Sequence, residues 1–497
     1  MTEESEQVKE KPPLSRKVKV VALSMGQGLA RVIGLMTMMV MARVLTKEDL
    51  AAYNQTLLAY AFVAPFIGLG ISQGIFYFLP TEKFRIRGRV LDAITIQAAM
   101  GLFFALFLAF GGNQLLAARF DNPKVAEMLL WLIPYAMVTP PAQQCVAVLV
   151  VRDQVMRSSV FQVTRQFFIG IATILPVLIW QTAEAPLIGN VVASVLFGFE
   201  AIRLMIKATP NDSQTPTREG IQEILKFSLP LGLATMAGTI SMQMDKMIVG
   251  FMFSPEEFAV YSLGAIEIPL LAVLTGSITS IMLPEIRKAV AENNKAEALR
   301  LFKMAANKTS LVIFPAMIFL FVCSTPFILM LYGDAYADSV YPFQVYLLKL
   351  PYRVVVFGSL LMALGQNLFI LKRSIWGLVM GGGVSYMLVQ YIGPIGAAVG
   401  GVLVAYIYAV PANFRALSRG LGVPWFETLN FPVLARTFLM SLPVGVLGWL
   451  SVFVLKEYHP VIQLTAAGVV VGPYCLWWWH GKLYDLVSLR ERFFNGS

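Results

Sequence analysis

The sequence predicts an all-α polytopic membrane protein with fourteen transmembrane helices. Composition is the first observation behind this prediction. Hydrophobic residues make up 57% of the 497 residues and charged residues only 14%, a balance outside that of ordinary soluble domains. The second observation is that the apolar residues gather in long runs. An α-helix needs roughly 20 residues to cross a hydrocarbon core about 30 Å thick, and the chain contains fourteen runs of that kind.

The predicted spans follow one another along most of the chain. They cover residues 20–44, 50–79, 90–111, 126–150, 157–181, 185–207, 224–252, 258–283, 309–332, 341–364, 368–390, 394–416, 430–455 and 461–480. All are assigned as helices, because the runs are too long and too uniformly apolar for the alternating strands of an outer-membrane barrel.

Lys and Arg residues indicate the orientation of these spans. With fourteen crossings, 29 of the 39 Lys and Arg residues fall on the side of the amino-terminal tail and 5 on the opposite side. Short cytoplasmic loops are the ones that retain such residues, so we predict a multi-pass protein with both termini in the cytoplasm and no cleaved signal peptide. The formal net charge of +10 follows from this topology, and it favours contact with anionic membrane lipids rather than nucleic acid.

Cysteine and histidine are sparse. Cys145, Cys323 and Cys475 lie far apart within apolar spans, and His459 and His480 stand at opposite ends of the last span. We therefore expect no disulfide framework, no metal site and no cofactor. Because no polar segment is long enough to form a separate catalytic domain, we also expect that the protein is not an enzyme and has no catalytic residues.

Polar segments divide the chain into units. We expect a cytoplasmic tail over 1–19, a six-helix bundle over 20–207, a cytoplasmic linker over 208–220, a second six-helix bundle over 221–417, two additional transmembrane helices over 418–480 and a cytoplasmic tail over 481–497. The linker, ATPNDSQTPTREG, contains two prolines and several turn-forming residues, which favour a flexible hinge. The amphipathic segment 287–308 is expected to form a surface helix or a helical extension.

An internal repeat relates the two bundles. The sequence TKEDLAAYN at residues 46–54 is matched by SPEEFAVYS at residues 254–262, 208 residues later. Each stretch begins with a helix-capping Thr or Ser, has two acidic residues in the first turn and has a Tyr at the same offset. We interpret the two halves as parallel copies that form two bundles with a substrate path between them; a chance similarity of two acidic helix starts is the alternative.

Three stretches resemble the multidrug/oligosaccharidyl-lipid/polysaccharide exporter superfamily, and within it the polysaccharide-transporter branch of O-antigen-type flippases. They are ARVLTKEDLAAYNQTLLAYAFVAPFIGLGISQGIFYFLP (42–80), LKFSLPLGLATMAGTISMQMDKMIVGFMFSPEEFAVYSLGAIEIPLLAVLTGSITSIMLPEI (225–286) and TPFILMLYGDAYADSVYPFQVYLL (325–348). The resemblance extends over about residues 20–417.

This resemblance implies a V-shaped pair of six-helix bundles in the bacterial cytoplasmic (inner) membrane. The bundles would open alternately to each side and turn over a polyprenyl-diphosphate-linked oligosaccharide, namely an O-antigen, capsule or exopolysaccharide repeat unit. A polysaccharide polymerase and glycosyltransferases would be partners. Many relatives have twelve helices, whereas the fourteen predicted here match members such as the peptidoglycan-precursor flippases.

Ionisable residues inside the apolar spans carry the site prediction, because a charge at that depth costs roughly 2.5–3.5 kcal/mol. Counting from the helix ends places Asp245, Lys246, Glu267 and Lys349 in one layer of the second bundle, with Arg353 one turn deeper. Adjacent residues of a helix point about 100° apart, so Asp245 and Lys246 cannot simply neutralise each other. Each needs a partner on another helix, or water.

The cations of these spans are predicted to bind the substrate. Lys349 and Arg353 share a helix face on either side of Pro351, and two cations on one face suit a diphosphate or an acidic sugar. Arg31 lies near the midplane of the first bundle and is expected to face the same cavity. We therefore predict substrate binding by Arg31, Lys246, Lys349 and Arg353.

The acidic residues are predicted to couple transport to an ion. Asp245 and Glu267 are the candidates for binding H⁺ or Na⁺. The alternative is that these charges only form buried ion pairs that fix the register of the helices. We expect such a structural pair between Arg165 and Glu200, which lie on consecutive spans at similar depth.

Other functions remain open at this point. A cation-coupled multidrug exporter of the same superfamily would favour carboxylates, yet the first span offers Arg31 and no acid. A peptidoglycan lipid-precursor flippase would have the same number of helices. A membrane glycosyltransferase would need acidic catalytic groups in a substantial external loop, and the external loops predicted here are short.

Overall fold

A computed structural model gives the fold. It describes residues 16–494 apart from residues 81, 121, 213–214, 269–270 and 272–284. Every regular element among the described residues is a helix, which confirms the all-α class. The predicted cytoplasmic tail 1–19 lies mostly outside the described residues.

The helices of the two halves of the chain have these bounds. The first half contains α1 (Arg16–Val44), α2 (Lys47–Gly68), α3 (Ile71–Phe78), α4 (Ile86–Phe107), η1 (Leu108–Gly112), α5 (Asn113–Ala117), α6 (Lys124–Trp131), α7 (Ile133–Ala142), α8 (Cys145–Val151), α9 (Val155–Trp180) and α10 (Glu184–Lys207). The second half contains α11 (Arg218–Met252), α12 (Pro255–Gly264), α14 (Lys295–Val322), α15 (Ser324–Tyr332), η2 (Asp334–Ser339), α16 (Val340–Leu347), α17 (Leu350–Val354), α18 (Phe357–Ala363), α19 (Asn367–Ile392), α20 (Ile395–Val404), η3 (Ala405–Ala409), α21 (Val410–Leu421), η4 (Trp425–Glu427), α22 (Phe431–Val454) and α23 (Pro460–Phe494).

The described residues contain up to twelve candidate membrane spans, whereas the sequence predicts fourteen. Ten helices among the described residues are long and apolar enough to cross a membrane. Two further spans are formed if each of two bent pairs crosses once, α6 with α7–α8 at 50° and η2–α16 with α17–α18 at 42°.

The two predicted spans that are not among these twelve are 224–252 and 258–283. α11 covers the first of them and has 35 residues, a length of about 52 Å, but Asp245 and Lys246 interrupt its apolar run. α12 forms the start of the second span, and most of the remainder lies outside the described residues.

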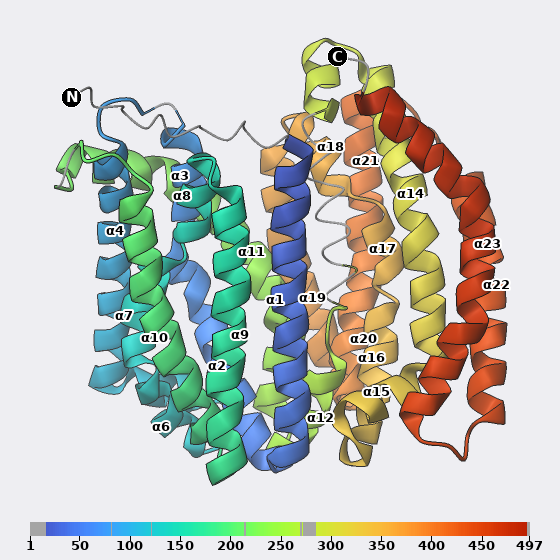
Figure 1. Ribbon diagram of the computed structural model, residues 1–497, viewed down its shortest axis with the longest axis horizontal. Coiled ribbons are helices and arrows are strands. Elements are labelled where there is room, and N and C mark those ends of the chain that lie inside the picture. Colours follow the sequence, from blue (N-terminus) through green and yellow to red (C-terminus); the bar gives the residue numbers. More distant parts are fainter. Residues whose placement is uncertain are drawn as a thin grey trace, which may run out of the picture.

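The two halves of the chain form two helical bundles (Figure 1). α1 stands near the middle of the view, and α22 and α23 lie at the outer edge of the second bundle, where α22 packs on α14. The Trp479 Nε1 donates to the Leu311 carbonyl at 3.1 Å, which fastens α23 to α14.

α1 begins and α23 ends at the same end of the molecule, which we call the termini end, and we call the opposite end the far end.

α11 belongs to the interface of both bundles. Its first half packs against α2 and α3, and its second half packs against α19 and α20. The contact with the first bundle is a close approach of two backbones. A Cβ built on Gly232 would lie 2.6 Å from the Leu69 carbonyl carbon, and Gly70 has the positive φ of +68° that favours glycine. The division between the bundles therefore runs along α11 and not only through the linker.

The linker before α11 is docked on the first bundle, in contrast to the predicted flexible hinge. Asp212 accepts a hydrogen bond from the Ile86 backbone N–H at 2.7 Å, at the start of α4. The Asp92 carboxylate accepts one from the Thr217 N–H at 2.7 Å, and the Arg152 Nε donates to the Ala208 carbonyl. Composition suggested a flexible segment, but partners distant in sequence hold its described residues in place.

The internal repeat is visible where the two bundles meet at the far end. Thr46 caps α2 and Ser254 caps α12, each by accepting from the N–H three residues later. α2 and α12 pack against each other, and the Asn54 Nδ2 donates to the Ser262 Oγ at 3.4 Å. These two residues are 208 positions apart, the spacing of the repeat. Repeat-related residues touch each other only where the pseudo-twofold axis passes, so this contact marks that axis.

Candidate functional site

A charged cluster lies in the second bundle and consists of Asp245, Glu267, Lys349 and Arg353. Asp245 comes from α11, Glu267 from the segment that follows α12, and Arg353 from α17. Lys349 stands at the break between α16 and α17, where Pro351 begins the new helix. Proline cannot continue the hydrogen bonding of the preceding helix, and the chain bends by 42° at this break. Lys349 lies at the bend, and Arg353 lies one turn later on α17.

Asp245 is a buried carboxylate with three partners. It accepts hydrogen bonds from the Tyr261 hydroxyl at 2.9 Å and from the Tyr346 hydroxyl. The Lys349 Nζ lies 4.0 Å from the same carboxylate and 3.8 Å from the centre of the Tyr346 ring. A buried carboxylate is stable only when it is paired and hydrogen-bonded, and these three side chains supply that environment.

Arg353 and Glu267 form the second ion pair of the cluster. The two pairs differ in exposure, since the Asp245 side chain is 7% exposed and the Glu267 side chain 41%. A small pocket joins them: its lining includes Glu267, Lys349 and Arg353 together with Tyr346. Lys349 is thus paired with a buried carboxylate, and Arg353 is paired with a carboxylate that solvent reaches.

The structure brings together four of the six predicted site residues. Lys246 is half-buried and its backbone N–H donates to the Asp245 carboxylate, but its ammonium group has no hydrogen bond or ion pair with the described residues. Arg31 is exposed on α1, and no contact within the described part of the chain joins it to Lys349 or Arg353. The roles assigned to all six residues remain predictions.

The predicted pairing of Arg165 with Glu200 is wrong. Glu200 instead pairs with Arg203 on the same helix at 3.0 Å, with both side chains exposed. The i, i+3 spacing makes these two residues neighbours on the helix surface. No ion pair to Arg165 is found among the described residues.

Two tyrosines of the cluster were not predicted. Tyr261 is the Tyr that stands at the same offset in both stretches of the repeat, and Tyr346 precedes Lys349 by one helical turn. Both positions could therefore have been found from the sequence. The residue at the repeat-related position of the first bundle is Tyr53. Its hydroxyl accepts from the Asn190 side chain at 3.3 Å, so the first bundle has a neutral amide where the second has the Asp245 carboxylate.

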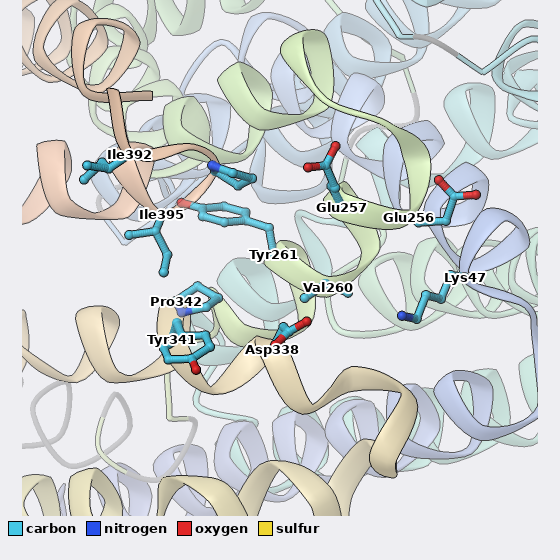
Figure 2. Close-up of a pocket in the computed structure, with 11 residues that line it drawn as sticks. Lys47, Glu256, Glu257, Val260, Tyr261, Asp338, Tyr341, Pro342, Ile392 and Ile395 are labelled. Carbon is cyan, nitrogen blue, oxygen red and sulfur yellow. The ribbon is translucent and has the colours of Figure 1, made fainter. Parts of the chain in front are cut away.

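A second pocket, of about 340 Å³, opens at the far end beside the charged cluster (Figure 2). Tyr261 forms part of its wall while the hydroxyl of the same residue bonds Asp245. Three acidic side chains and one cation also line it, namely Glu256, Glu257, Asp338 and Lys47. The excess of acidic groups favours cations there. The described residues contain no group of three or more His, Cys, Asp or Glu side chains placed to hold a metal ion.

The fold is that of the MOP transporter superfamily. A structure of the lipid II flippase MurJ in its inward closed conformation matches 93% of this chain and 100% of that chain, with a TM-score of 0.75 and 17% sequence identity. An inward-facing multidrug resistance MATE family transporter matches 82% of this chain and 98% of that chain, with a TM-score of 0.62 and 16% identity. A MOP superfamily transporter from Pyrococcus furiosus matches 81% and 96%, with a TM-score of 0.60 and 16% identity.

The sequence places the chain more narrowly. The chain belongs to the polysaccharide biosynthesis protein family, whose model matches residues 40–341. No curated protein matches the sequence. The protein is therefore a multi-pass membrane protein of the polysaccharide biosynthesis family, with a fold similar to that of MOP superfamily transporters.

Proposed function

We propose that the protein is a flippase that carries a polyprenyl-diphosphate-linked oligosaccharide across the bacterial cytoplasmic membrane by alternating access. The family implies a glycan substrate, and the fold is similar to that of a lipid II flippase. The observation that carries the proposal is the pair of cations on the bent α16–α17 segment, Lys349 and Arg353, each paired with a carboxylate from another segment.

The two cations would bind the diphosphate by exchanging their partners. Arg353 offers a planar guanidinium that can donate two parallel hydrogen bonds to a phosphate, and Lys349 offers a compact positive charge. Glu267 is the more exposed of the two carboxylates, so its replacement by a phosphate requires less desolvation than the replacement of Asp245. The sugars would occupy the path between the bundles while the polyprenyl chain stays in lipid.

The released carboxylate would then couple transport to a cation. A Glu267 that has lost Arg353 would be free to bind a cation, H⁺ or Na⁺, in its place. Binding of substrate and cation would be reciprocally linked. The acidic pocket beside Tyr261 supports access of that cation to Asp245 from the far end, which is the external face in the proposed topology.

The topology proposed for this mechanism has fourteen crossings, with both termini in the cytoplasm. α11 and the segment that begins with α12 would supply the two crossings beyond the twelve counted above. An even number of crossings agrees with the fact that α1 begins and α23 ends at the same end of the molecule. The bundles would open to one side or the other about the contact of α2 with α12.

Flipping in proteoliposomes tests the proposal. We expect the double variant Lys349→Gln with Arg353→Gln to lose at least tenfold in the rate of translocation of a lipid-linked oligosaccharide, because both cations of the charged cluster are removed. Arg203→Gln is the matched control, since Arg203 pairs with Glu200 on the exposed surface. Translocation by the double variant at the wild-type rate contradicts the cationic site. Export of cationic dyes without any translocation of glycan lipid would instead assign the chain to the multidrug exporters.

A further inference from the structure

A third cation lies beside the charged cluster and has neutral partners. Arg373 belongs to α19, and its Nη1 donates to the Asn413 side-chain oxygen at 2.9 Å and to the Tyr352 hydroxyl at 3.3 Å. Asn413 is fully buried on α21, and Tyr352 precedes Arg353 on α17. Two other helices, α17 and α21, therefore hold the Arg373 side chain in one position.

The charge of Arg373 is not neutralised by these contacts. Among the described residues Arg373 has no ion pair, whereas Lys349 and Arg353 each have a carboxylate partner. An arginine has five N–H donors, and the hydrogen bonds to Asn413 and Tyr352 both come from Nη1. Nε and Nη2 make no hydrogen bond to the described residues. Arg373 is half-buried, so these donors are fixed in place and still free to bind an anion.

The part of α19 that carries Arg373 is close to the termini end. Arg373 is in the second turn of α19, which follows α18, and α18 and α21 lie toward the end where α1 begins (Figure 1). The chain runs from Lys349 through Arg353 on α17 to α18 and then to the start of α19, so Arg353 is nearer to the termini end than Lys349 is. An anion that enters from the termini end would meet the unpaired charge before the two paired ones.

We infer that Arg373, held by Asn413 and Tyr352, is the first docking point for the diphosphate group of the substrate before that group reaches Arg353 and Lys349. This inference rests on the proposed function and adds a binding step to it. A phosphate oxygen can bind Nε and Nη2 without displacing a carboxylate. Docking at Arg373 therefore needs no exchange of ion pairs, and the exchange follows only when the phosphate moves on to Arg353.

Binding of a short prenyl diphosphate to the purified protein in nanodiscs tests the inference. We expect Arg373→Gln to weaken the affinity for farnesyl diphosphate about tenfold or more, and Arg373→Lys to weaken it less, because it keeps the charge. Lys372→Gln is the matched control, since Lys372 is the adjacent, exposed cation; it should leave the affinity unchanged. The salt dependence of binding should become shallower in Arg373→Gln, which a purely structural role would not produce.

A second variant tests the charge without shortening Arg373. Asn413→Asp places a carboxylate at the position of the amide that accepts from Arg373, so it neutralises the cation while it preserves the contact. We expect this variant to fold and to bind farnesyl diphosphate as weakly as Arg373→Gln. Wild-type affinity in Asn413→Asp overturns the inference, even if Arg373→Gln fails to fold.

Three probes separate the source of the anion. Competition by inorganic pyrophosphate would show that the phosphates are recognised. Binding of farnesyl diphosphate that pyrophosphate does not compete with would show that the lipid chain is also required. Either result supports the inference. Equal binding of farnesol overturns it. If Arg373→Gln binds normally while the Lys349 and Arg353 variants do not, the docking step is wrong and the proposed function stands. If none of the three variants changes affinity, both are wrong.

Discussion

Asp245 and Lys246 are neighbours in the sequence with opposite surroundings. The Asp245 carboxylate is enclosed by two phenols and an ammonium group, whereas the Lys246 ammonium has no such partner among the described residues. A rotation of about 100° per residue is sufficient to cause this difference. Asp245 therefore forms its ion pair with Lys349, 104 positions away along the chain, and not with the adjacent Lys246.

Replacement of Asp245 tests this pairing. We expect Asp245→Asn to reduce translocation at least tenfold, because Lys349 loses its counter-charge in a poorly solvated position. Asp245→Glu keeps the charge and should retain part of the activity. Translocation in proteoliposomes is the measurement, with the amount of inserted protein as the reference. An unaltered rate in Asp245→Asn would show that the buried ion pair is unimportant for transport.

Replacement of Glu267 should have a different effect on binding. Glu267→Gln removes the carboxylate that competes with a phosphate for Arg353, so we expect farnesyl diphosphate to bind more tightly and translocation to slow, because release becomes harder. Glu200→Gln is the control, as Glu200 pairs with Arg203 on the exposed surface. Weaker binding of the probe by Glu267→Gln would contradict the exchange of partners. The affinity is measured by calorimetry in nanodiscs.

The sequence predicts which charges lie at one depth but not which charges meet. Depth follows from counting residues along a helix, so Asp245, Glu267 and Lys349 could be placed in one layer. Their pairing depends on the rotation of each helix and on the bend at Pro351, which are set by packing between segments far apart in the chain. For the same reason the sequence did not predict the partner of Glu200, where a nearer residue, Arg203, satisfies the charge.

Among the elements, α11 is the helix that joins the bundles. Its first half is held by close glycine contacts to the α2–α3 segment, and its second half carries Asp245, which accepts from Tyr261 on α12 and Tyr346 on α16. Any movement of one bundle against the other must bend α11 or slide it along one of these surfaces. Pro230 lies inside the helix near the glycine contact, and proline removes a backbone hydrogen bond at such a point.

A pair of glycine substitutions on α11 tests the tight contact. We expect Gly232→Ala to destabilise the protein by about 1–3 kcal/mol, the usual effect of overpacking, because the new Cβ would meet the Leu69 carbonyl carbon at 2.6 Å. Gly238→Ala on the same helix has no atom within 4 Å of the new Cβ and should be neutral or slightly stabilising. Thermal unfolding in detergent measures both. Equal stability of the two variants would contradict the close approach.

Element type was predictable throughout, because long apolar runs allow only helices in a membrane. Breaks within the runs were less predictable. The predicted span 50–79 is divided into α2 and α3 at Leu69 and Gly70, both of which have positive φ. The reason is the approach of Gly232 from α11, a tertiary contact that no local pattern shows.

At the scale of the whole molecule, the two bundles contact each other at the far end through several side chains. Asn54 bonds Ser262 on the pseudo-twofold axis, Phe120 stacks edge-on against Phe251 at 5.0 Å between ring centres, and Arg43 donates to the Met330 carbonyl. The first contact is polar and the second apolar, and all three join residues of different bundles. In alternating access these contacts would have to separate before the far end could open.

A disulfide across this contact should stop transport. In a chain whose three native cysteines are replaced by alanine, we expect Asn54→Cys with Ser262→Cys to form a cross-link that abolishes translocation until it is reduced. Ser72→Cys with Gln144→Cys is the control, because these side chains bond each other at 2.9 Å within the first bundle. Full activity of the oxidised Asn54–Ser262 pair would show that the far end need not separate.

The contact of Asn54 with Ser262 also bears on the origin of the fold. A residue that meets its own counterpart across a twofold axis is the defining feature of an isologous interface, the kind that forms between identical subunits of a homodimer. The single chain thus has, at this contact, the geometry expected between two copies of one unit. At this point a change in one half is met by the unchanged residue of the other half, so the two positions act on the same contact.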